Sequence, residues 1–138
     1  MKKKIAILGS TGSIGKTLIN IIKKDIKNFE IVLLSADGNY KELIKQAKFF
    51  KVKNLIITNE NSFDKVKNDR SLKKIKIYNN FNNFKKIFRK KVDYIMSSIS
   101  GIQGLKPTIE IIKFTNKIAI ANKEAIICGW DLIQKELK

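Results

Sequence analysis

Three glycines near the amino terminus are spaced in a way that suits phosphate binding. They stand at positions 9, 12 and 15 of the segment GSTGSIG, which follows the apolar run Ile5–Leu8 and leads into a second apolar segment. Glycines allow a tight turn and a close approach of the backbone to a pyrophosphate, and a helix that starts here points free N–H groups at the anion. Thr11 and Ser13 add hydroxyl donors. The segment is therefore predicted to bind a dinucleotide, although the usual spacing is G-x-G-x-x-G; the alternative is a plain turn in another α/β protein.

A second polar segment places an amide, an ammonium and a carboxylate at consecutive positions. These are Asn122, Lys123 and Glu124, and they follow the apolar run 117–121. A helix start would explain Asn122 as its cap and Glu124 as a favourable charge near the positive end of the helix dipole. It would not call for a lysine in the first turn, so Lys123 indicates something more than capping.

The residues alone leave the choice between NADH and NADPH open. Asp37 ends the second predicted strand, and an acid near this position accepts hydrogen bonds from the adenosine ribose, which favours NAD. Gly38 and Asn39 offer backbone and amide donors, and Lys41 lies close enough to reach a 2′-phosphate. The net charge of this loop is therefore near zero.

Strands alternate with helices along the whole chain. The periodicity predicts strands at 4–8, 30–35, 54–58, 75–78, 92–96 and 117–121, and helices at 13–24, 40–50, 60–69, 84–88, 104–115 and 125–138, the last interrupted around Gly129. In the first helix, Ile14, Leu18, Ile21 and Ile22 share one face and are expected inward. This order predicts an α/β fold with a doubly wound, mostly parallel, Rossmann-like sheet in one domain over 1–138. Four loops, 9–15, 36–39, 97–104 and 121–124, should then line one edge of the sheet.

Length and composition describe a globular protein without a membrane segment. The chain has 138 residues, of which 43% are hydrophobic, and no apolar run approaches the ~20 residues of a membrane span. Its single cysteine, Cys128, excludes an internal disulfide and suits a reducing cytoplasm, which is the predicted location. With no histidine and one cysteine, a zinc site is not expected.

The net charge of +17 raises nucleic acid as a partner, but the residue types argue against it. Only Arg70 and Arg89 are arginines; the other basic residues are lysines scattered along almost every segment. Arginine is the side chain that suits bidentate recognition of bases and phosphates. We expect no nucleic-acid partner. A basic binding module stays as the alternative, and salt-sensitive DNA binding that NADPH does not affect would favour it.

Three motifs together resemble the 1-deoxy-D-xylulose 5-phosphate reductoisomerase family. They are the segment 9–15, Gly101-x-x-Gly104-Leu105-x-Pro107-Thr108, and Ala121-Asn122-Lys123-Glu124, with fitting separations over the whole chain. The resemblance implies an NADPH-dependent oxidoreductase of the non-mevalonate isoprenoid pathway. Such an enzyme rearranges 1-deoxy-D-xylulose 5-phosphate with the help of a divalent metal and reduces the product to 2-C-methyl-D-erythritol 4-phosphate. Another NAD(P)-dependent dehydrogenase with the same turn is the alternative.

The resemblance also implies roles for individual residues. It implies that the pyrophosphate of the cofactor is bound by Thr11, Gly12, Ser13 and Ile14. The adenosine ribose would lie by Gly38 and Asn39, and the nicotinamide side by Asn122 and Glu124. The substrate would be contacted by Lys123. The family often has Gly followed by a basic residue where this chain has Asp37-Gly38.

No catalytic residue and no metal ligand is assigned within this chain. Family members are longer, and their acidic ligands for Mg²⁺ or Mn²⁺ are expected beyond residue 138. The 138 residues are therefore expected to be the NADPH-binding part, without turnover of their own. The full-length protein could be a homodimer.

Overall fold

A computed structural model describes residues 1–138 and contains one six-stranded sheet in the order β4-β3-β2-β1-β5-β6. Every neighbouring pair of strands is parallel, which confirms the predicted doubly wound α/β fold. The direction of winding reverses beside β1, because β2 and β5 lie on its two sides. The strands are β1 (Lys3–Leu8), β2 (Phe29–Ala36), β3 (Asn54–Ile57), β4 (Lys76–Tyr78), β5 (Val92–Ser97) and β6 (Thr115–Ile120).

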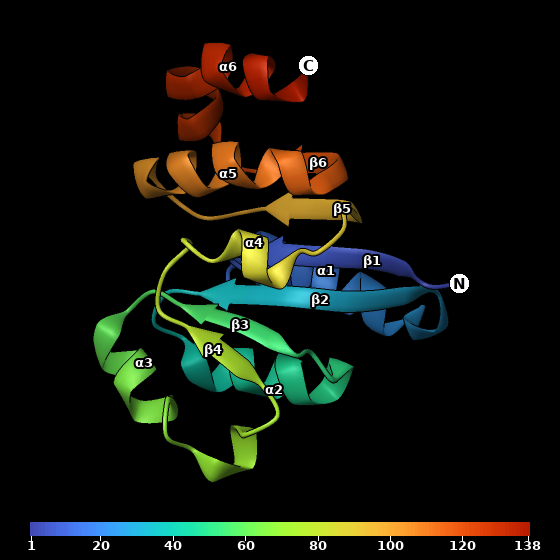
Figure 1. The fold of residues 1–138 in the computed structure, drawn as a ribbon, viewed down its shortest axis with the longest axis vertical. Helices are drawn as coiled ribbons and strands as arrows, with labels where there is room; N and C mark the ends of the chain where they lie inside the picture. The colour runs from blue at the N-terminus through green and yellow to red at the C-terminus, as the bar shows by residue number, and fades with distance from the viewer.

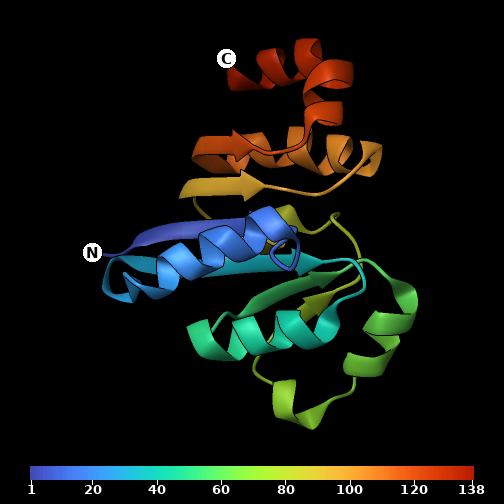
Figure 2. The ribbon, with the colours of Figure 1, turned by 180° about the vertical axis from the view of Figure 1, so that it is seen from behind.

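Helices cover both faces of the sheet. Helices α1 and α2 lie together on one face (Figure 2), and α4 and α5 lie on the other, while α6 stands beyond β6 and carries the C-terminus (Figure 1). No helix combines the length and apolar character that crossing a membrane requires. The helices are α1 (Ser13–Lys23), α2 (Tyr40–Phe50), α3 (Glu60–Val66), α4 (Phe84–Ile87), α5 (Leu105–Ile111) and α6 (Lys123–Leu137), with short 3-10 turns at Ile26–Asn28, Arg70–Leu72, Ile102–Gly104 and Ile112–Phe114.

Alternate residues of the strands belong to two separate hydrophobic cores, one on each face of the sheet. Ile5 and Ile7 of β1 join a cluster that includes the buried faces of α1 and α2, whereas Ala6 and Leu8 join a second cluster with α4 and α5. Successive side chains of a strand point to opposite faces, so a strand buried on both sides reads as a continuous apolar run. This is the reason that the run Ile5–Leu8 has no polar residue.

The predicted inward face of α1 is partly wrong. Ile22 is buried and Leu18 is half-buried, but Ile14 and Ile21 are 47% and 58% exposed. The buried positions of α1 are Gly15, Ile19 and Ile22, which follow the same helical spacing in a different rotation. The helix takes this rotation because Gly15 must face the preceding turn, and that leaves Ile14 pointing outward.

The many lysines are almost all unpaired. Two ion pairs between exposed side chains occur: Lys67–Asp64 at the C-terminal end of α3 and Lys106–Glu110 within α5. Such exposed pairs contribute little to stability, on the order of 0–1 kcal/mol. The excess of positive charge is therefore carried by solvated side chains rather than by a buried network.

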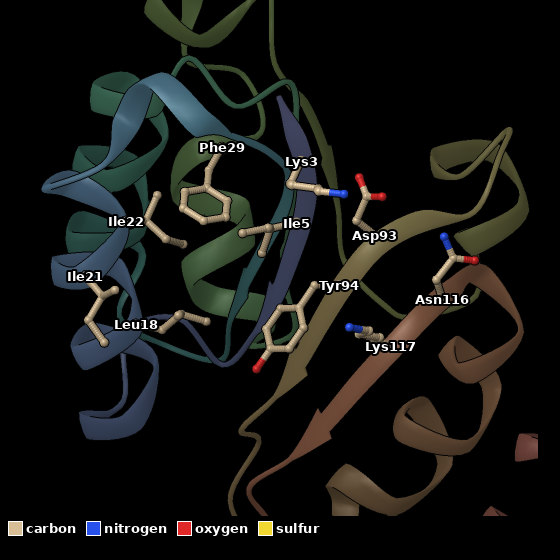
Figure 3. Close-up of a pocket in the computed structure, with 10 residues that line it drawn as sticks. All are labelled: Lys3, Ile5, Leu18, Ile21, Ile22, Phe29, Asp93, Tyr94, Asn116 and Lys117. Carbon is tan, nitrogen blue, oxygen red and sulfur yellow. The ribbon is translucent and has the colours of Figure 1, made fainter. Parts of the chain in front are cut away.

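An apolar groove of about 470 Å³ lies beside α1, next to the amino-terminal halves of the strands (Figure 3). Its apolar lining includes Leu18 and Ile21 of α1 and Phe29 of β2, and Tyr94 of β5 faces it. Burial among these groups raises the pKa of the Tyr94 hydroxyl above its ordinary value. The groove is at the opposite end of the strands from the glycine-rich turn, so it is separate from the predicted dinucleotide site.

The raised pKa of Tyr94 predicts a loss of stability in strong alkali. Below about pH 10 the phenol keeps its proton in both the folded and the unfolded chain, so its contribution is fully present. Above that pH the unfolded chain releases the proton first, and rising pH therefore favours unfolding. Tyr94→Phe should remove this component. A difference titration of phenolate absorbance between wild type and variant measures it, and a Tyr94 component that titrates at or below pH 10 would contradict the assignment.

Candidate cofactor-binding site

The glycine-rich turn uses some of its backbone donors internally and leaves others free. The N–H of Gly9 donates to Ser35 Oγ and the N–H of Ser10 donates to the Ser35 carbonyl, both over 2.9 Å. No hydrogen bond within the protein uses the N–H groups of Thr11, Ser13 and Ile14. The donors that remain therefore belong to the end of the turn and the first residues of α1.

Helix α1 starts in a form that is open to an anion. Gly12 is its N-cap residue, which has no side chain to bond the exposed N–H groups, and the first turn contains no acidic residue. By contrast, Asn39, Asn59 and Asn122 cap α2, α3 and α6 with their side-chain oxygens. Free N–H groups together with the positive end of the helix dipole favour a bound phosphate.

The three glycines of the turn have different structural roles. Gly9 has a φ of +80°, and a side chain there would meet the Ser98 carbonyl oxygen at 2.8 Å. A side chain on Gly15 would overlap the Gly9 carbonyl and come within 2.6 Å of the Ser10 Cα. Gly12 is exposed, and an added Cβ would have only an ordinary contact of 3.7 Å with the Gly9 carbonyl. Gly9 and Gly15 are therefore needed for packing, whereas Gly12 faces open space.

Hydrogen bonds connect the turn to the loop that follows β5. The N–H of Ser98 donates to the Leu8 carbonyl over 2.9 Å, and its hydroxyl reaches the carbonyls of Leu8 and Gly9 at 2.9 and 3.1 Å. These contacts hold the ends of β1 and β5 together at the point where the winding of the sheet reverses. In open α/β sheets the ligand lies in the crevice at this point.

Asn122 connects the next two loops, and both hydrogens of its side-chain amide are used within the protein. Its Oδ1 accepts from the Ala125 N–H over 3.0 Å, and its Nδ2 donates to the carbonyls of Ile99 and Gly101. A hydrogen bond that Asn122 donates to the cofactor would therefore have to come from its backbone. Its side chain fixes the 99–101 loop against the start of α6.

The other two predicted residues of this segment are accessible. Lys123 is exposed and Glu124 is half-buried, and neither takes part in an ion pair. They begin α6 directly after β6, next to the loop that Asn122 holds. The structure thus brings the segment 121–124 to the same edge of the sheet as the glycine-rich turn.

The predicted ribose-side residues follow β2 at the same edge. Asp37 Oδ1 accepts a hydrogen bond from the Thr58 hydroxyl over 2.7 Å, so one oxygen of this carboxylate is already bonded to the residue that follows β3. Asn39 Oδ1 accepts from the Glu42 N–H, so its amide group remains as a donor. A Cβ on Gly38 would meet nothing closer than the Ser62 hydroxyl at 3.9 Å. This loop therefore has room for a ligand group or a side chain.

Several hydrogen bonds of the site could not be read from the sequence. Ser97 and Ser98 belong to a predicted edge loop and Thr108 to a family motif, but nothing in the sequence shows that the hydroxyls of Ser97 and Thr108 lie 2.7 Å apart in the interior or that the Ser98 hydroxyl reaches the end of β1. Gln46 of α2 is buried against Ser10, although a helix pattern places glutamine outside. The structure contains no group of three or more His, Cys, Asp or Glu side chains that could hold a metal.

The family assignment follows from the sequence match that accompanies this geometry. The sequence model of 1-deoxy-D-xylulose 5-phosphate reductoisomerase matches residues 5–129, which include the turn, the 98–104 loop and the 121–124 segment. The chain belongs to the 1-deoxy-D-xylulose 5-phosphate reductoisomerase family. The resemblance found in the motifs is thereby confirmed.

Individual members agree with this assignment. The chain is 59% identical over 138 residues to the reductoisomerase of Pelagibacter ubique (strain HTCC1062), covering 99% of this chain and 36% of the relative. Its fold matches the reductoisomerase of Zymomonas mobilis in complex with NADPH, with a TM-score of 0.88, 24% identity and coverage of 99% and 36%. A reductoisomerase in complex with NADPH, fosmidomycin and magnesium matches with a TM-score of 0.86, 24% identity and coverage of 97% and 33%. The chain thus spans about a third of the length of the relatives it matches.

The different roles of the glycines predict opposite effects of one substitution. Gly15→Ala should lower the free energy of unfolding by about 1–3 kcal/mol or more, because the new methyl group overlaps backbone atoms that cannot move aside easily. Gly12→Ala is the matched control, with a change near 1 kcal/mol or less as for other N-cap exchanges. Urea denaturation of both variants measures the difference. Equal stability of the two variants would contradict the packing role of Gly15.

Proposed function

We propose that residues 1–138 form the NADPH-binding part of a 1-deoxy-D-xylulose 5-phosphate reductoisomerase. The observation that carries the proposal is the open start of α1, where Thr11, Ser13 and Ile14 keep unused N–H groups beside the exposed Gly12. In a member of this family, these groups suit the pyrophosphate of the cofactor. Three of the four residues to which the family resemblance assigns the pyrophosphate have a free N–H; the fourth, Gly12, donates its N–H to the Gly9 carbonyl and supports the proposal by its exposure.

Different residues at this edge of the sheet bind different parts of the cofactor. The N–H groups and hydroxyls of Thr11 and Ser13 hold the pyrophosphate, helped by the α1 dipole. Gly38 and the amide of Asn39 lie at the adenosine ribose. The backbone at Asn122 and the Glu124 side chain serve the nicotinamide side, which the loop 98–104 separates from the pyrophosphate. When bound, NADPH supplies the hydride for the reduction step.

Lys123 is proposed as a substrate-binding residue. It is exposed at the start of α6 and has no acidic partner, so its ammonium is available to an anionic substrate. A fixed positive charge stabilises negative charge that develops on a substrate oxygen during the rearrangement, and such prepositioned charges account for a large share of many rate enhancements.

The exposed face of α6 supports the view that more polypeptide packs beside Lys123. Ile127 is 76% exposed, and Trp130 and Leu132 are each about half exposed on the same helix. Large apolar patches on a monomer usually mark an interface. The proposal therefore places the region that closes over the substrate outside residues 1–138, together with the ligands of Mg²⁺ or Mn²⁺. The whole enzyme is proposed to be cytoplasmic and able to form a homodimer.

Gly12→Val tests the placement of the pyrophosphate. Gly12 has a φ of −77° and a ψ of 175°, which valine adopts without strain, so the variant should fold. Its side chain would fill the space in front of the free N–H groups. We expect NADPH affinity to fall by at least about tenfold, which corresponds to about 1.4 kcal/mol. Calorimetric titration measures the affinity and circular dichroism checks the fold; unchanged affinity in a folded variant would refute the proposal.

Asp37 tests the choice of cofactor. NADPH is the proposed cofactor because of the family, with weaker discrimination against NADH than a basic loop would give. Gly38→Arg should increase the preference for NADPH, since the loop has room for the side chain and arginine pairs well with a phosphate. Asp37→Ala should weaken any residual NADH binding. If wild type prefers NADH and Asp37→Ala loses that preference, Asp37 is a ribose ligand and NADPH is the wrong cofactor.

A further inference from the structure

Gln46 of α2 makes a reciprocal contact with the glycine-rich turn, across 36 positions of sequence. The Ser10 hydroxyl donates to Gln46 Oε1 over 2.7 Å, and Gln46 Nε2 donates to the Ser10 carbonyl over 3.0 Å. Both residues are buried, with Ser10 fully enclosed and Gln46 only 3% exposed. The carbonyl can only accept, so the amide group of Gln46 must present its nitrogen to it. One side chain therefore fixes one peptide group of the turn.

The direction of that peptide group decides where the next N–H points. The Ser10 carbonyl and the Thr11 N–H belong to the same planar trans peptide, so they point in opposite directions. Gln46 holds the carbonyl toward α2, and the Thr11 N–H consequently points away from α2. If the peptide turned over, a carbonyl oxygen would take the place of a donor. A carbonyl repels a phosphate, whereas an N–H binds it.

Other contacts fix the neighbouring peptide but leave this one to Gln46. Ser35 accepts from the N–H groups of Gly9 and Ser10, and Ser98 donates to the Gly9 carbonyl. These bonds hold the start of the turn. The Ser10 carbonyl accepts a hydrogen bond from Gln46 and from no other group.

We propose that Gln46 is a positioning residue for the cofactor's pyrophosphate, which it does not touch itself. It orients the Ser10–Thr11 peptide so that the Thr11 N–H faces the phosphates. This inference rests on the proposed function of the turn. Because Gln46 lies seven residues, or about two helical turns, after the Asn39 cap, α2 also connects the turn to the ribose-side loop.

Gln46→Met keeps the length of the side chain and removes both hydrogen bonds. We expect NADPH to bind about tenfold more weakly, as for a lost donor in a buried network. Adenosine 2′-monophosphate carries the ribose phosphate but no pyrophosphate, so its affinity should stay unchanged. Lys45→Met places the same residue at the exposed neighbouring position of α2, and it should alter neither affinity. Titration calorimetry gives both affinities, and thermal unfolding gives the stability.

Two further variants separate the backbone contact from the hydroxyl contact. Gln46→Glu keeps an acceptor for the Ser10 hydroxyl but cannot donate to the Ser10 carbonyl when ionised, so it should weaken NADPH binding at least as much. It also replaces Gln46→Met as the test if that variant does not fold. Ser10→Ala removes the hydroxyl contact with Gln46 Oε1 and a longer one of 3.4 Å with the Ser35 carbonyl, but it keeps the contact of the Ser10 carbonyl with Gln46, so it should have a smaller effect. A loss with Ser10→Ala as large as with Gln46→Met would overturn the role of the carbonyl contact.

The ratio of the two affinities distinguishes positioning from general damage. A parallel loss of NADPH and adenosine 2′-monophosphate binding, or unchanged NADPH binding in folded Gln46→Met, would overturn the inference. A wild-type protein that binds no NADPH would overturn the proposed function itself, and the inference with it. A selective loss of NADPH binding in the Gln46 variants would support both.

Discussion

The close packing of Gly15 on the backbone of Gly9 and Ser10 is the constraint on which the rest of the site depends. It fixes where α1 starts, how the helix is rotated and which of its residues face the sheet. Because the turn is tight, its first two N–H groups reach Ser35, the Gly12 N–H reaches the Gly9 carbonyl, and those of Thr11, Ser13 and Ile14 are left without partners. The same packing that stabilises the strand-to-helix connection thus leaves free the N–H groups to which we assign the pyrophosphate.

Short polar side chains at the strand ends connect the loops of this edge by hydrogen bonds. Ser35 lies near the end of β2, Ser98 follows β5 and Asn122 comes after β6, and each bonds a loop of a neighbouring strand. Buried polar groups need such partners. Within the glycine-rich turn, the N–H groups of Thr11, Ser13 and Ile14 have none inside the protein.

Local patterns determined the architecture and the outline of the site. Apolar runs predicted the strands, because a parallel strand is covered on both faces, and the alternation with helices predicted the doubly wound sheet. The spacing of Gly9, Gly12 and Gly15 indicated phosphate binding, and Asn122 indicated a helix cap, which its contact with the Ala125 N–H confirms. All of these features depend on residues within a few positions of each other, so a sequence can display them.

Contacts that residue types and spacing do not display were decided only by the tertiary structure. The rotation that exposes Ile14 depends on backbone atoms of the turn, and the use of both amide hydrogens of Asn122 depends on a loop 21 to 23 residues away. Gln46 looks like a surface residue of an amphipathic helix until the fold brings it to Ser10. A sequence shows which groups are able to donate and accept, but only the three-dimensional arrangement shows which of them are already used. For this protein, that difference determines which donors are left for a ligand.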